Sequence, residues 1–133
     1  MDLQPCVTIK KEWDIVAARQ LGRDVAKEAG FSTVDQARIA TAISELARNI
    51  YLYTDGGKIS VEQIDTLEHK GLSVIASDSG PGIEDISRVM EDGYTTSRGL
   101  GAGLPGVRRL MDEFDIKSNS GEGTEVKALK IIR

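Results

Sequence analysis

Three short segments carry residues that could bind a nucleotide, and they follow one another along the chain. They are Glu45-x-x-x-Asn49, Asp78-Ser79-Gly80-Pro81-Gly82 and Gly99-Leu100-Gly101-Ala102-Gly103. The first could supply a metal-binding oxygen, the second a hydrogen-bond acceptor for an adenine amine, and the third backbone amides for phosphate groups. Each segment is weak alone, but the combination indicates a nucleotide site.

Glu45 and Asn49 are expected on one flank of a helix. At about 100° per residue they lie about 40° apart, and about 100° from the centre of the apolar stripe formed by Ile39, Ile43, Leu46 and Ile50. This places both at the border between core and cleft. Asn49 offers a neutral oxygen of the kind that Mg²⁺ accepts, and Glu45 could take a proton from a hydroxyl nearby. Taken alone, such a pair is more often a solvated helix flank.

Asp78 follows the apolar run at residues 72–76, so it is expected where a strand ends at the mouth of a cleft. A carboxylate there could accept a hydrogen bond from the exocyclic amine that adenine has and guanine lacks at that position. Gly80 and Gly82 leave room for a flat base close to the backbone. The simpler alternative is a turn, which this composition also favours.

Glycines alternate over residues 99–103 just before a predicted helix that starts at Leu104. Their exposed N–H groups and the helix start favour phosphate, and Arg98 could contact the outermost phosphate with two hydrogen bonds. The segment is neither a Walker loop nor a Rossmann fingerprint. The alternative is a flexible surface loop. The several hydroxyl groups of residues 94–97, beside the glycines, make this alternative less favoured.

The remaining pattern predicts the elements that position these segments. Helices are expected at residues 12–29, from Ser32 or Thr33 to about Tyr53, and at 104–114, and Thr33 and Gln36 match a capping box at the start of the second helix. Strands are expected at residues 7–10, 58–64, 72–76, 114–118 and 124–132. Trp13, Phe31 and Phe114 are expected to lie in the core or to staple helix ends. We predict one domain over residues 1–133, an α/β two-layer sandwich with helices on one face of a mostly antiparallel sheet.

Composition narrows the class of protein. There are 17 basic and 21 acidic residues in 133, with a net charge of −4 and no basic run, so nucleic acid is not an expected partner. No segment has the roughly 20 apolar residues needed to cross a bilayer, and no signal-peptide pattern is present, so no membrane association is expected. The single cysteine, Cys6, suits a reducing compartment and is expected to fill the core. A cytoplasmic protein is the expectation.

Together the three segments resemble the N, G1 and G2 boxes of the GHKL ATPase/kinase superfamily, which has the Bergerat ATP-binding fold. Their order and spacing match over residues 33–128, and Ile83 and Thr124 match a G1 isoleucine and a threonine near the adenine. The segment at residues 94–104 looks like that of the small bacterial serine/threonine kinases of sigma-factor control.

This resemblance implies ATP and Mg²⁺ as cofactors, Asn49 as metal ligand, Glu45 as catalytic base and Asp78 as the adenine acceptor. It implies further nucleotide contacts from Gly80, Gly82, Ile83, Thr96, Arg98, Gly99, Leu100, Gly101, Ala102, Gly103, Leu104 and Thr124. The implied substrate is a hydroxyl on a STAS-domain scaffold or antagonist protein, and the second implied partner is a PP2C-type phosphatase that the kinase activates.

Two other functions stay open at this point. One is a non-catalytic, nucleotide-dependent interaction module, either anti-sigma-like or phosphatase-activating. The other is an isolated ATPase domain of a larger machine. Glu45 separates the first from a kinase, because a pure binder has no need of a carboxylate one helical turn from the metal ligand.

Overall fold

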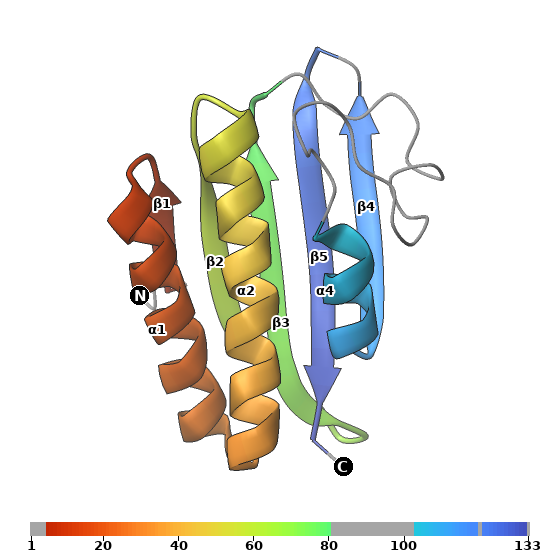
Figure 1. The fold of residues 1–133 in the computed structure, drawn as a ribbon. Helices are drawn as coiled ribbons and strands as arrows, with labels where there is room; N and C mark the ends of the chain where they lie inside the picture. Colours follow the sequence, from red (N-terminus) through yellow and green to blue (C-terminus); the bar gives the residue numbers. More distant parts are fainter. Residues whose placement is uncertain (1–4, 81–102, 120, 133) are drawn as a thin grey trace.

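The computed structural model describes residues 5–80, 103–119 and 121–132. Along the chain the elements are β1 (Cys6–Ile9), α1 (Glu12–Ala29), α2 (Thr33–Tyr53), β2 (Gly57–Asp65), β3 (Lys70–Asp78), α4 (Leu104–Leu110), β4 (Glu113–Asn119) and β5 (Gly123–Ile131). The five strands form one sheet in the order β1-β2-β3-β5-β4, and every neighbouring pair is antiparallel. The helices cover one face of this sheet (Figure 1), which confirms the predicted two-layer α/β fold.

The core lies between the helices and the sheet. Strand alternation gives each central strand one set of buried side chains on the helix side, and the two long helices add apolar residues at three- and four-residue steps. The largest side chains that are almost completely buried are Ile9, Ile39, Ile43, Ile59, Val61, Leu72, Val74 and Val107. This layer holds α2 against the centre of the sheet, next to the strand end that carries Asp78.

The turn between α1 and α2 explains where both helices stop and start. Gly30 ends α1 in the left-handed conformation, with φ of 100°, which favours glycine. Ser32 is the N-cap of α2, and its hydroxyl accepts a hydrogen bond from the backbone N–H of Asp35 at 3.1 Å. The predicted capping box of Thr33 and Gln36 is therefore wrong, because the Gln36 amide instead donates to the carbonyl of Phe31.

Three further expectations need correction. Helix α4 ends at Leu110 and not at Phe114, because Phe114 belongs to β4, where it pairs with Ala128. Cys6 is exposed and not in the core, since alternation along β1 directs Val7 and Ile9 toward the helices. Trp13 is 66% exposed and lies under the Lys11 ammonium, which is 5.0 Å from its ring centre.

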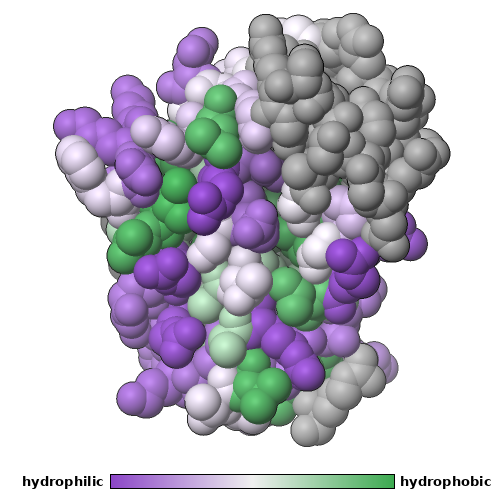
Figure 2. Space-filling model, viewed as in Figure 1, coloured by the Kyte–Doolittle hydropathy of each residue, from purple (hydrophilic) through white to green (hydrophobic). Residues whose placement is uncertain are grey.

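The outer surface of the helix layer is mostly polar with isolated apolar side chains (Figure 2). Besides Trp13, the exposed large apolar residues of the helices are Val16, Val34 and Leu52. Within the described ranges, no helix is long and apolar enough to cross a membrane.

Candidate nucleotide site

The C-terminal half of α2 carries the first predicted pair. Glu45 and Asn49 are both half-buried, while Leu46 and Ile50 between and beside them are buried in the core. The two polar side chains therefore lie on the flank of the helix that its geometry predicts. Because neither side chain fills the core, both could face a ligand without weakening the packing of α2.

Asp78 is the last residue of β3, at the edge of the helix layer. It pairs with Gly57 on β2 and with Thr124 on β5. One carboxylate oxygen accepts a hydrogen bond from the backbone N–H of Gly80 at 2.8 Å, and the backbone N–H of Thr124 also donates to the carboxylate. Burial raises the pKa of Asp78, and these two hydrogen bonds only partly counter it. The carboxylate is thus held by the backbone on both sides and partly removed from water.

Gly57 is a residue that the sequence did not single out. A Cβ built at Gly57 would overlap the carbonyl oxygen of Ser77 and would lie 3.0–3.1 Å from Cβ and Cα of Asp78. A side chain at this position would therefore push β3 away from β2 just where Asp78 emerges. In the sequence, the Gly56-Gly57 pair is equally consistent with the end of the preceding helix, although close strand pairing also favours glycine.

Thr124 pairs with Asp78 across β3 and β5, in agreement with what the resemblance implies. Its hydroxyl is 2.9 Å from the Ser118 hydroxyl, and Ser118 also donates to the carbonyl of Gly123 at 3.1 Å. These contacts join the ends of β4 and β5. They give Thr124 a fixed side chain next to the carboxylate.

The described residues on either side of the 81–102 segment both rest on α2. A Cβ built at Gly80 would lie 2.7 Å from Cγ2 of Thr54, the C-cap of α2. A Cβ built at Gly103, the N-cap of α4, would lie 2.5 Å from Oε2 of Glu45. Asn49 lies between Glu45 and Thr54 in the helix sequence. The structure therefore brings the ends of the second and third predicted segments to the same half-helix as the first.

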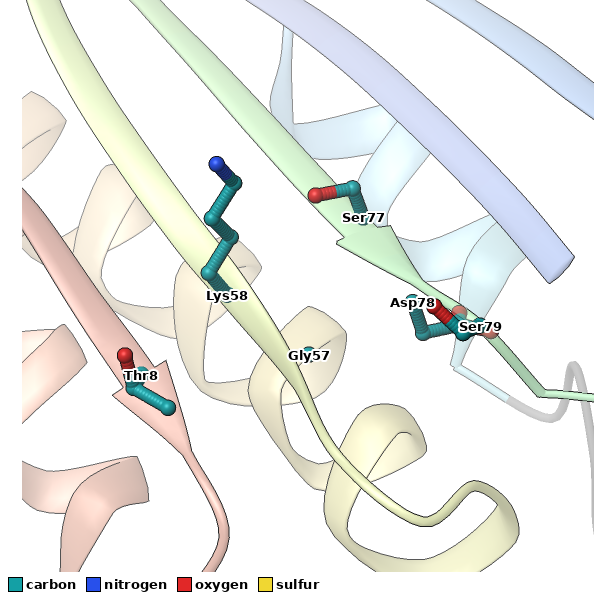
Figure 3. Close-up of a pocket in the computed structure, with 6 residues that line it drawn as sticks. All are labelled: Thr8, Gly57, Lys58, Ser77, Asp78 and Ser79. Atoms are coloured by element: carbon teal, nitrogen blue, oxygen red, sulfur yellow. The ribbon is translucent and has the colours of Figure 1, made fainter.

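Two shallow hollows flank the end of β3 on the sheet. One, of about 340 Å³, is lined by Thr8, Gly57, Lys58, Ser77, Asp78 and Ser79; the other, of about 390 Å³, is lined by residues of β3, β4 and β5 that include Lys117, Thr124 and Glu125. Figure 3 shows Thr8, Lys58 and Ser77 on the side of the sheet away from the helices. Gly80 and Gly103 instead meet α2, on the helix-covered side of the sheet.

Several predicted contacts lie outside the described residues: Gly82, Ile83, Thr96, Arg98, Gly99, Leu100, Gly101 and Ala102. Leu104 is described, and its side chain is buried in the core, with 3% exposed. Among the described residues, no group of three or more His, Cys, Asp or Glu side chains could hold a metal ion.

Residues 34–131 match the family described as histidine kinase-, DNA gyrase B-, and HSP90-like ATPase. The chain belongs to this family. Solved structures of the family share its fold: the catalytic domain of the histidine kinase ThkA superposes with a TM-score of 0.59 at 17% identity, covering 96% of this chain and 97% of that one. The mycobacterial sensor histidine kinase MprB gives a TM-score of 0.58 at 14% identity, covering 97% of each chain.

Similarity to individual proteins indicates the class of enzyme. The chain is 68% identical to the serine/threonine-protein kinase RsbT of Bacillus subtilis over 133 residues, all of both chains. It is 33% identical to the anti-sigma F factor of Caldanaerobacter subterraneus over 101 residues, which are 72% of this chain and 70% of that protein. The chain is thus an ATP-using protein serine/threonine kinase of the GHKL superfamily, related to regulators of sigma factors.

Two positions of the site were missed by sequence reasoning, Gly57 and Thr54. Thr54 ends α2, and its hydroxyl donates to the carbonyl of Ile50 at 2.7 Å and accepts from the backbone N–H of Gly56 at 3.0 Å. It is also the residue against which Gly80 packs. The only sequence signal was a threonine just before Asp55-Gly56-Gly57, which is ordinary for a helix end.

Proposed function

We propose that this kinase transfers the γ-phosphoryl group of Mg-ATP to a serine or threonine of a STAS-domain scaffold or antagonist protein. We further propose that it then changes partner and activates a PP2C-type phosphatase in a cytoplasmic stress or sigma-factor pathway. The observation that carries the site assignment is the meeting of Gly80 and Gly103 with α2 on either side of Asn49. The partners rest on the likeness of residues 94–104 to small sigma-factor kinases.

Adenine recognition is assigned to Asp78. A carboxylate has about four acceptor positions, and two are taken by the N–H groups of Gly80 and Thr124. Acceptor capacity remains for the amine of adenine. Phosphate contacts are assigned to Thr96, Arg98 and the glycines of residues 99–103, from their types and order in the sequence.

Asn49 is proposed to hold Mg²⁺ together with the phosphates. The donor fits, because Mg²⁺ keeps several water molecules and needs few protein oxygens when a nucleotide supplies the others. When bound, the ion would neutralise charge on the phosphate oxygens. Asn49 is half-buried and one turn from Glu45, so an ion there would lie near the proposed base.

Glu45 is proposed to be that base. The acceptor hydroxyl oxygen forms a bond to the γ-phosphorus, the bond from that phosphorus to the bridging oxygen of ADP breaks, and the hydroxyl proton passes to the Glu45 carboxylate. ADP leaves with the bonding electron pair. Catalysis of this kind depends mainly on position, which the rigid α2 supplies.

The test is a labelling experiment with γ-labelled ATP and STAS-domain proteins encoded near the kinase gene. Label should reach a serine or threonine of one such protein, and mass spectrometry should locate it. Unphosphorylated STAS protein should compete with a PP2C-type phosphatase for the kinase, and phosphorylation should release the kinase to stimulate the phosphatase. Label that reaches no STAS protein would remove the proposed substrate class while leaving the enzyme class intact.

Two variants separate binding from transfer. Asn49→Ala should weaken Mg-dependent ATP binding and lose activity with it. Glu45→Gln should bind Mg-ATP as the parent does but transfer phosphate about 10²–10⁴-fold more slowly, if the full general-base contribution is lost. Glu28→Gln, an exposed helical glutamate on α1, is the matched control and should behave as the parent. A Glu45→Gln variant with the parent rate would show that Glu45 is not the base.

A further inference from the structure

The contact between Gly103 and Glu45 joins the first turn of α4 to the proposed base. A Cβ built at Gly103 would lie 2.5 Å from Oε2, 3.2 Å from Cβ and 3.3 Å from Cδ of Glu45. Gly103 has φ of −89° and ψ of −9°, in the right-handed region that any residue adopts. The backbone conformation therefore does not require glycine at position 103. Glycine is required there because a side chain would collide with Glu45.

The surroundings indicate which group would move if that space were filled. Leu104 and Val107, on the first turns of α4, are 3% and 0% exposed and belong to the core. Shifting α4 away from α2 would disturb both side chains. The Glu45 carboxylate is the far end of a half-buried side chain with rotatable bonds. It would give way before the helix does.

We propose that Gly103 is a positioning residue for Glu45, whose missing side chain lets the carboxylate lie against the start of α4. The proposal rests on the proposed role of Glu45 as base, and it gives Gly103 a task in addition to the phosphate contact expected from the glycine loop. A methyl group at position 103 would displace the carboxylate while leaving the fold in place. Misplacing a catalytic group by about 1 Å can cost on the order of 10²-fold in rate.

The test compares Gly103→Ala with Gly106→Ala, a glycine-to-alanine change in the same helix. A Cβ at Gly106 meets nothing nearer than the Arg109 guanidinium at 4.0 Å, so this control should keep the parent rate. Gly103→Ala should lower kcat for transfer to the STAS acceptor by about 10- to 100-fold. Alanine keeps the backbone N–H through which Gly103 would contact phosphate, so the KM for ATP and the calorimetric Kd for Mg-ATP should stay near the parent values, whereas loss of that contact would raise both.

A double-mutant cycle distinguishes positioning of Glu45 from a general effect on the enzyme. If Gly103 acts through the carboxylate, adding Gly103→Ala to Glu45→Gln should cause little further loss of rate, because the two changes remove the same contribution. If the double variant loses rate by the product of the two single losses, the proposal is overturned. It is also overturned if Gly103→Ala transfers phosphate at the parent rate while Glu45→Gln is slow. A fast Glu45→Gln enzyme would instead reject the base itself, and the proposal for Gly103 with it.

A readout without activity covers the case in which Gly103→Ala folds poorly. Truncation by Glu45→Ala removes the Oε2 and Cδ atoms that the new methyl group would meet and leaves only the Glu45 Cβ, at 3.2 Å. The Gly103→Ala/Glu45→Ala double variant, measured against Glu45→Ala alone, should then recover most of the Tm that Gly103→Ala loses. If Gly103→Ala lowers the Tm as much in the Glu45→Ala background as in the parent, Gly103 is needed for a reason other than the Glu45 carboxylate, and the proposal is overturned.

Discussion

Replacing Asp78 by asparagine tests adenine recognition with the smallest change of shape. In the parent, the carboxylate accepts hydrogen bonds from the N–H groups of Gly80, at 2.8 Å, and of Thr124, and acceptor capacity remains for the adenine amine. Asparagine keeps one oxygen and replaces the other by an NH₂ group, which is a donor. That group would face at least one of the N–H donors of Gly80, Thr124 and adenine, so at least one hydrogen bond is lost.

The size of the effect follows from the charge on the acceptor. A hydrogen bond to a charged group contributes about 1.5–3 kcal/mol, and every 1.4 kcal/mol is about tenfold in affinity. We therefore expect Asp78→Asn to bind ATP about 10- to 100-fold more weakly. GTP lacks the amine at that position, so its affinity should change less, and the preference for ATP over GTP should shrink.

The assay is isothermal titration calorimetry with Mg-ATP and Mg-GTP on the parent, on Asp78→Asn and on a control. Asp65→Asn is a suitable control, because Asp65 is exposed and lies at the opposite end of the β2–β3 pair. Circular dichroism should confirm that all three proteins are folded. If Asp78→Asn binds ATP as tightly as the parent, or if the parent binds GTP equally well, Asp78 does not select adenine.

Two further predictions concern stability. Burial raises the pKa of Asp78 above its ordinary value of 3.8. The contribution of this shift to the free energy of unfolding is therefore complete below pH 3.8 and is lost as the pH rises through the native pKa. Urea titrations over this window should show the free energy of unfolding of the parent falling relative to that of Asp78→Asn, and a constant or opposite difference would contradict the shift. The second concerns Lys130, whose side chain is 12% exposed and donates to the Leu110 carbonyl at 2.8 Å, with Asp35 at 4.0 Å. Lys130→Met should lower the free energy of unfolding by about 1–3 kcal/mol. Lys127→Met, at an exposed position on the same strand, is the control and should leave it unchanged. Equal urea midpoints for the two variants would show that the hydrogen bond from Lys130 to the Leu110 carbonyl does not stabilise the fold.

Local pattern was sufficient for the helices and most strands, but not for the contacts between them. Gly30 and the apolar spacing of α1 and α2 are visible in the sequence because they are properties of neighbouring residues. The pairing of β3 with β5 joins strands separated by the whole 81–102 segment. That pairing places Thr124 beside Asp78. Only the resemblance, and no local pattern, predicted this neighbour.

The errors have physical reasons that were partly present in the sequence. Trp13 was expected in the core because it is aromatic, yet it shares a helix face with Ala17 and Gln20, which are exposed. Cys6 has the same alternation phase as Thr8, opposite to Val7 and Ile9. In both cases the position of the residue in the helix or strand repeat predicts exposure correctly, whereas the residue type alone predicts burial.

The glycine contacts could not have been predicted from type or phase. Gly57, Gly80 and Gly103 each have a neighbour within van der Waals distance of a missing Cβ, and each neighbour belongs to another element. A sequence shows only that glycine is present, and a turn explains it equally well. Which glycines make room for a functional side chain depends on how the helices lie on the sheet.

The proposed site would divide its two tasks, adenine binding and phosphoryl transfer, between two elements. Asp78 is fixed by backbone groups of the sheet, through its pairing with β2 and β5, whereas Glu45 and Asn49 are fixed by α2. The contact of Gly80 with Thr54 joins the two parts at the helix end. A change confined to the sheet side should therefore act mainly on nucleotide affinity, and a change at Glu45 mainly on the rate of transfer. Because α2 is packed into the core along its other face, its polar flank keeps the spacing between Asn49, the proposed metal ligand, and Glu45, the proposed catalytic base, whether or not adenine is bound at Asp78.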